Sequence, residues 1–163
     1  MKRISSLIVL SLVAICVMAA GETSATHTFE VLNTDSFKEK VWNFDECPYL
    51  KFKDAEKGAI IDFYADWCGP CKLLTPELEA VQAIYGDCIN FYKVNIDKEG
   101  RELGMKFKTN QLPTLFFIPA GAIGNSKIHR EIGWKNKREL TKIIEQYIVP
   151  SLPNRPETNK KGK

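Results

Sequence analysis

Apolar residues along the chain follow two patterns: short runs typical of strands, and longer segments with apolar positions every three or four residues, typical of helices. Strands are predicted at residues 27–32, 58–66, 88–97, 114–118 and 127–132. Helices are predicted at residues 34–43, 71–85, 99–107 and 136–148. Because strands alternate with helices and the last two strands follow each other directly, the pattern predicts an α/β domain. We expect a mixed central sheet, mostly parallel, with helices on both faces.

Two segments interrupt or end this pattern. Residues 45–57 (DECPYLKFKDAEK) are polar and aromatic, and Pro48 prevents a continuous helix, so we expect an insertion that folds over the surface. Residues 150–163 (PSLPNRPETNKKGK) are rich in Pro and Lys without apolar periodicity, which predicts a disordered basic tail. The residues between the termini, 27–149, are enough for one domain with its own core.

The first twenty residues (MKRISSLIVLSLVAICVMAA) have the three parts of a secretory signal peptide. Lys2 and Arg3 precede an apolar stretch, and small residues follow it, which places cleavage between residues 19 and 25. The alternative is an uncleaved membrane anchor, because residues 4–20 are only just shorter than the roughly 18 apolar residues of a spanning candidate. We interpret the segment as a signal for export to the periplasm or a similar space, with no membrane insertion after cleavage.

The charge and the cysteine content limit the classes of function that the protein can have. Cleavage after residue 20 reduces the 23 basic side chains to 21, against 20 acidic ones, and this balance gives no electrostatic case for binding nucleic acid or a membrane surface. Four cysteines remain after the signal: Cys47, Cys68, Cys71 and Cys88. Outside the cytosol, thiols tend to be oxidised unless something keeps them reduced. Cysteine chemistry is therefore the central question.

Cys68 and Cys71 follow the strand at 58–66 and begin the helix that comes after it. A sulfur at a helix N-terminus lies near unsatisfied N–H groups and the positive end of the helix dipole, which favours the thiolate. The three-residue spacing places Cys71 on the same face, within reach of a disulfide. We expect Cys68, the more exposed thiol, to attack a substrate disulfide and Cys71 to resolve the mixed disulfide.

Two other interpretations of this pair have less support. A zinc site needs two more ligands, yet the sequence has no second CxxC, and His27 and His129 lack metal-ligand spacing. A purely structural disulfide across four residues gains little loop-closure entropy. Neither a metal nor a cofactor is expected.

Cys47 lies in the insertion, and Cys88 lies just before the strand at 88–97. If the strands at 58–66 and 88–97 run parallel, both cysteines lie near the sheet end opposite the CxxC. They either form a structural disulfide, which export permits, or remain free, as partly buried cysteines often do.

The stretch DFYADWCGPCK resembles the active site of the thioredoxin family, and the resemblance extends from about Phe29 to Ile148. It implies a thioredoxin fold. It also implies that Asp62 is the buried carboxylate that assists proton transfer at the second cysteine, and that Lys93 pairs with it. Burial agrees with this role, because desolvation raises the pKa of a carboxyl group and makes its proton available.

The same resemblance implies a substrate-binding rim. The stretch NQLPTLFF is similar to the cis-proline loop of the family, in which Pro113 lies against the cysteine pair and the Leu112 backbone pairs with an extended substrate. The other positions implied to contact substrate are Trp67, Gly69, Pro70 and Gly133. The chain departs from the family at Tyr64, where many thioredoxins have tryptophan, and in the 45–57 insertion.

The function that follows is an exported thiol-disulfide oxidoreductase that reduces or exchanges disulfides in protein substrates. Gly-Pro between the cysteines resembles the strongly reducing members, so a reductase is favoured, and in an oxidising compartment it needs a membrane-borne electron donor. We expect a monomer. The alternatives are a dedicated reductant for cytochrome c maturation, a disulfide-forming oxidase, and a docking or chaperone module with incidental redox activity.

Overall fold

The computed structural model describes residues 29–154, which contain one five-stranded mixed sheet with the strand order β1-β3-β2-β4-β5. The strands are β1 (Glu30–Val31), β2 (Gly58–Tyr64), β3 (Ile89–Asn95), β4 (Thr114–Ile118) and β5 (His129–Ile132). β3 pairs in parallel with β1 and β2, whereas β4 is antiparallel to both β2 and β5. The predicted thioredoxin fold, with a mixed sheet and a closing antiparallel pair, is confirmed.

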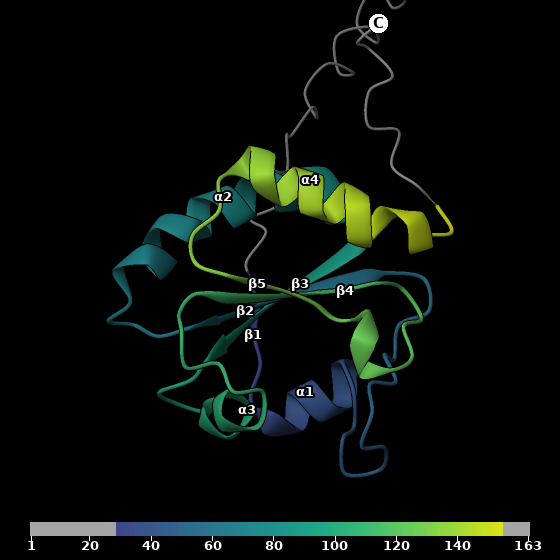
Figure 1. Cartoon of the computed structure of the whole chain (residues 1–163), viewed down its shortest axis with the longest axis horizontal. Helices are drawn as coiled ribbons and strands as arrows, with labels where there is room; N and C mark the ends of the chain where they lie inside the picture. Colours follow the sequence, from purple (N-terminus) through teal and green to yellow (C-terminus); the bar gives the residue numbers. More distant parts are fainter. Residues whose placement is uncertain (1–28, 155–163) are drawn as a thin grey trace, which may run out of the picture.

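Helices cover both faces of the sheet (Figure 1). The four α-helices of the described residues are α1 (Thr34–Lys40), α2 (Gly69–Tyr85), α3 (Arg101–Lys106) and α4 (Lys137–Tyr147). Figure 1 shows α2 and α4 on one face, and α1 and α3 on the other. All four predicted helices are confirmed, with ends that differ from the predicted ones by a few residues at most.

The central strand β2 explains why the sheet has two apolar layers. All but the last residue of β2 is buried, and alternate side chains enter opposite layers, as the two-residue period of a strand requires. Ile61 and Phe63 belong to the core under α1 and α3, whereas Ile60 belongs to the core under α2 and α4. The side chain of Asp62 falls on the same side as Ile60, directly beneath the start of α2.

The insertion at 45–57 has no helix, but it is tied closely to the connection between β4 and β5. The Leu50 amide donates to Asn125 Oδ1 at 2.7 Å, and the Phe52 amide donates to the Ala122 carbonyl at 2.9 Å. The Leu50 and Phe52 side chains are buried in the α1 layer. The prediction of a surface insertion is therefore too simple, because the segment also contributes to the core.

The predicted disordered tail is wrong for residues 150–154. Val149–Ser151 form a 3-10 helix, η2, and Leu152 is buried with the side chains under α4. A hydrogen bond from the Ala120 amide to Ser151 Oγ, at 2.9 Å, fixes this turn against the sheet. One isolated apolar residue gives no periodicity, which is why the sequence pattern does not indicate this contact.

Several predictions lie outside the described residues: the signal peptide at 1–20, its cleavage between 19 and 25, and the tail from residue 155. Within residues 29–154, no helix has the length and apolar character needed to cross a membrane.

Candidate active site

The cysteine pair lies where β2 leads into α2. Cys68 is the N-cap of α2, and its sulfur accepts a hydrogen bond from the Cys71 amide at 3.2 Å. The two residues form a disulfide with a sulfur–sulfur distance of 2.09 Å. Pro70 occupies the first turn, where its missing N–H is not needed. The predicted placement at the helix N-terminus is confirmed.

The two cysteine residues do not differ in exposure as expected. Cys68 and Cys71 are each only 3% exposed, so in the disulfide form Cys68 is not the more accessible residue. The two cysteines form a buried cluster with Ala65. The partly buried side chains of Tyr64, Ile96 and Leu112 pack against this cluster. What distinguishes Cys68 is its place at the helix N-cap, where unpaired backbone N–H groups favour a negative sulfur.

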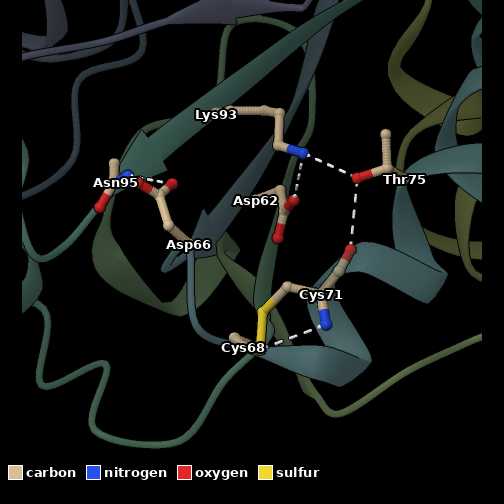
Figure 2. Close-up of polar contacts among 7 residues, drawn as sticks. All are labelled: Asp62, Asp66, Cys68, Cys71, Thr75, Lys93 and Asn95. Atoms are coloured by element: carbon tan, nitrogen blue, oxygen red, sulfur yellow. Dashed lines mark hydrogen bonds and ion pairs between the residues drawn. A yellow bond between two sulfur atoms is a disulfide. The ribbon is translucent and has the colours of Figure 1, made fainter.

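Asp62 and Lys93 meet beneath the cysteine pair, because they are register partners on the parallel strands β2 and β3. Asp62 is fully buried, and Lys93 Nζ lies 3.4 Å from its Oδ2 atom. Neither carboxylate oxygen has a hydrogen-bond partner among the described residues. Figure 2 shows the carboxyl group of Asp62 between the Lys93 ammonium and the disulfide.

The environment of Asp62 favours its neutral form. Burial raises the pKa of Asp62 from 3.8 to about 6, and the nearby Lys93 ammonium opposes this rise only in part. A carboxyl group with this pKa exchanges protons readily near neutral pH, which is the property required of a general acid or base for a thiol. Burial of the carboxyl group was predicted from the apolar residues on either side of it, and the structure confirms it.

The loop that precedes β4 also contributes to the site. The peptide bond between Leu112 and Pro113 is cis, and Leu112 packs against the cysteine cluster. The Gly133 amide donates to the Pro113 carbonyl at 2.8 Å, so the turn after β5 is fixed to this loop. Gly133 has a φ of +85°, a conformation that side-chain-bearing residues rarely adopt, which accounts for glycine at this position.

Large apolar side chains are exposed in the segments that adjoin the buried cysteines and the Leu112 loop. Trp67 is 71% exposed, and Leu73, Ile132 and Trp134 are also exposed. Trp134 donates from its indole nitrogen to the Leu73 carbonyl at 3.3 Å, which connects the turn after β5 to the first turns of α2. A set of large apolar side chains left in solvent around a reactive centre is typical of a surface that binds other molecules.

Some contacts at the site are not predicted from the sequence. The Trp67 indole donates to Asp97, and Asn95 Nδ2 donates to Asp66 Oδ1 at 2.9 Å. Lys93 also donates to Thr75 Oγ1 at 2.9 Å. Thr75 follows Cys71 by four residues on one helix face, a spacing that could have indicated its place at the site.

The alternative of a disulfide between Cys47 and Cys88 is not realised, because both are free cysteines. The sheet separates them. The Cys47 carbonyl accepts a hydrogen bond from the Trp42 indole in the α1 layer, at 2.8 Å. Cys88 packs against the α2 and α4 layer, with its sulfur 3.3 Å from the Tyr85 carbonyl. Proximity along one end of the sheet did not bring the two cysteines onto the same face.

Alkylation provides a direct test of this cysteine arrangement. When the oxidised protein is unfolded and treated with iodoacetamide without a reductant, peptides with Cys47 and Cys88 should be labelled and those with Cys68 and Cys71 should not. Mass spectrometry of the digest measures this. In a matched sample reduced with dithiothreitol, all four should be labelled. A cross-linked peptide pair containing Cys47 and Cys88 would contradict the structure.

The fold and the site together define a thiol-disulfide oxidoreductase. A cysteine disulfide lies at a helix N-terminus, a buried carboxyl group with a raised pKa lies beneath it, and large apolar side chains are exposed in the adjoining segments. Among residues 29–154, no group of three or more His, Cys, Asp or Glu side chains is placed to hold a metal ion.

Comparisons with known proteins agree with this class. The Thioredoxin family model matches residues 28–146. Thioredoxin from Borreliella burgdorferi is 35% identical over 117 residues, a match that covers 72% of this chain and 95% of that protein. Thioredoxin from Chlamydia trachomatis is 38% identical over 88 residues, covering 54% of this chain and 80% of that protein.

Solved structures are also similar. Chloroplastic thioredoxin z has a TM-score of 0.60 at 26% identity, covering 74% of this chain and 94% of its own. Thioredoxin from Malassezia sympodialis has a TM-score of 0.56 at 28% identity, covering 74% and 90%. This chain belongs to the thioredoxin family.

Proposed function

We propose that the protein acts after export, in the periplasm or a comparable space, as a reductase of disulfides in protein substrates. The observation that carries the reductase assignment is the Cys68–Cys71 pair at a helix N-terminus inside an exposed apolar rim, with Gly69 and Pro70 between the cysteines. Export is supported by the charged, apolar and small-residue segments of residues 1–25.

The rim is the proposed docking surface for an extended substrate segment. Trp67, Gly69 and Pro70 are exposed next to the cysteines in the chain, Leu112 packs against the cysteine cluster, and a hydrogen bond joins Gly133 to Pro113 in the same loop. Because Gly69 and Pro70 are exposed, and Gly69 has no side chain while that of Pro70 is compact, a substrate backbone can approach the Cys68 sulfur over them. The chemistry of binding is apolar contact with main-chain hydrogen bonding at the Leu112 loop.

The proposed reaction transfers two electrons from the dithiol to the substrate. The Cys68 thiolate attacks one substrate sulfur, forming a mixed disulfide and releasing the other substrate sulfur as a thiolate. Asp62 takes the proton of Cys71, whose thiolate then attacks the Cys68 sulfur. This second step releases the remaining substrate sulfur and leaves the Cys68–Cys71 disulfide. Lys93 stabilises the charge of Asp62 while it is ionised.

Regeneration of the dithiol requires a second exchange partner. In an oxidising compartment the substrate pool cannot supply electrons, so a membrane-borne dithiol donor is the partner proposed to reduce the Cys68–Cys71 disulfide. The same rim would receive this donor, because both partners must reach the same sulfur.

The equilibrium reduction potential tests the direction of exchange. We expect a value near the roughly −270 mV of thioredoxin, measured against dithiothreitol and glutathione, because a reductase must hold its electrons weakly. The variant with both Cys47→Ser and Cys88→Ser is the matched control, since only the active-site pair then titrates. A potential near the roughly −120 mV of a strong oxidant would overturn the assignment. Fractionation of cells expressing the full chain tests export separately.

A further inference from the structure

The hydroxyl group of Thr75 joins two parts of the site. Lys93 donates to Thr75 Oγ1 at 2.9 Å, and the Thr75 hydroxyl donates to the Cys71 carbonyl at 3.3 Å (Figure 2). A threonine inside a helix often bonds back to the carbonyl four residues earlier. Here the same oxygen also accepts from an ammonium group on β3, so it connects α2 to the partner of Asp62.

Lys93 Nζ is closer to Thr75 than to Asp62. The distance to Thr75 Oγ1 is 2.9 Å, whereas the distance to Asp62 Oδ2 is 3.4 Å, and Asp62 accepts no hydrogen bond from any described residue. The ammonium also faces the rings of Tyr64 and Phe29, at 4.6 and 5.4 Å from their centroids. These contacts hold Lys93 within electrostatic range of Asp62 but not in a direct hydrogen bond.

We propose that Thr75 is a positioning residue whose hydroxyl holds the Lys93 ammonium out of direct hydrogen bonding with Asp62, so that Asp62 can exchange a proton with Cys71. A direct bond from an ammonium would favour the carboxylate and make it a weaker base. Thr75 thereby sets the pH range over which Cys71 is activated. The inference rests on the proton-transfer role proposed above for Asp62.

Few other groups near Asp62 could determine how readily its carboxyl group takes up a proton. Lys93 faces it from β3 and Cys71 from α2, and its register partner on β4 is the apolar Leu115. A pocket of about 350 Å³, lined in part by Cys71, Thr75 and Lys93, opens beside this group. Water can therefore reach the place of the Thr75 hydroxyl if a smaller residue leaves it empty.

Valine is the informative substitution, because one of its methyl groups fills the place of the hydroxyl and keeps water out. In the Thr75→Val protein, Lys93 loses its nearest acceptor and Asp62 Oδ2 becomes the next one. We expect the titration midpoint of Asp62, followed by carbon NMR of its labelled carboxyl group in the disulfide form, to fall by about one pH unit. Thr75→Ser is the matched control and should titrate with the parent.

Two results would overturn the proposal. One is a Thr75→Val midpoint equal to or above that of the parent. The other comes from the Lys93→Met background: the effect acts through Lys93, so Thr75→Val should cause no shift there, and a persistent shift would mean that the hydroxyl acts on Asp62 directly. Circular dichroism checks folding. If valine disturbs α2, Thr75→Ala is used with a different expectation: water can take the place of the hydroxyl, so the Asp62 midpoint should fall by less than the shift expected for valine, and a midpoint above that of the parent contradicts the proposal.

The kinetics of mixed-disulfide resolution separate this proposal from the one on which it rests. Stopped-flow rates against pH should show a lower midpoint for Thr75→Val than for the parent, with Thr75→Ser unchanged. If Asp62→Asn leaves the pH profile of resolution unaltered, the proton-transfer role of Asp62 is wrong. The NMR midpoints would still decide whether Thr75 positions Lys93.

Discussion

Replacing Cys68 with serine should reduce disulfide reductase activity by roughly a thousandfold or more, to the rate of the reductant alone. The serine hydroxyl does not ionise near neutral pH, so the helix N-terminus that favours a thiolate at Cys68 has no nucleophile to stabilise. Insulin reduction with dithiothreitol, followed by the precipitation of the free insulin chains, measures this activity.

Cys71→Ser is the matched control for this result. It keeps the Cys68 nucleophile but removes the resolving thiol, so the first exchange should occur and stop at a mixed disulfide that non-reducing electrophoresis can detect. Cys68→Ser should form no such adduct through the active site. Reductase activity retained by Cys68→Ser would contradict the assigned order of attack. A cellular function retained without that activity would favour a docking module.

The second large effect concerns stability, because burial of Asp62 destabilises the folded protein as pH rises. The pKa of Asp62 is about 6 in the fold and 3.8 as its ordinary value, so between these pH values the unfolded chain loses the proton and the folded chain keeps it. The contribution of Asp62 to the free energy of unfolding is therefore largest below about pH 4, and it is lost as the pH rises through 6. The loss by pH 8 should be on the order of 3 kcal/mol.

Urea unfolding of the parent and Asp62→Asn at pH 4 and pH 8 measures this loss. The free energy of unfolding of Asp62→Asn relative to the parent should rise by about 2.5 kcal/mol between the two pH values, because a small part of the loss has already occurred at pH 4. Comparing the rise, and not the absolute stability, cancels the effects of the substitution that do not depend on pH, such as exchanging a neutral carboxyl group for an amide. A relative stability that does not change with pH would contradict the raised pKa.

Asp66→Asn is the control for a carboxyl group in the opposite environment. Asp66 is exposed, and a hydrogen bond from Lys98 lowers the pKa of its side chain. Its contribution to stability is therefore present at neutral pH and lost as pH falls, so its pH dependence should be small and opposite in sign to that of Asp62.

The sequence predicts the site well where the neighbouring residues in the chain determine whether a side chain is buried. A carboxyl group in the apolar run AIIDFYA has nowhere to go but the interior, and register with β3 then brings Lys93 beside it. The mixed sheet with its closing antiparallel pair follows in the same way from strands that alternate with helices and end in two consecutive strands. These features depend on patterns among residues that are close together in the sequence.

Other features depend on which face of the sheet a residue packs against, or on contacts between residues distant in the chain. Sequence patterns do not determine either. The sequence predicts Cys47 and Cys88 near one end of the sheet, but their contacts lie in opposite layers. The exposure of Cys68 depends on how Ala65 and Leu112 pack around the sulfurs, which involves residues far apart in the chain. The bond from Lys93 to Thr75 likewise requires the distance between β3 and α2.

The ties between the insertion and the β4–β5 connection affect the order in which the protein can fold. The backbone amides of Leu50 and Phe52 donate to Asn125 and Ala122, and these hydrogen bonds close a loop of more than half the domain. During synthesis or translocation, both backbone amides stay without these partners until the segment after β4 has emerged. The insertion therefore makes completion of the α1 layer a late step, dependent on the last third of the chain.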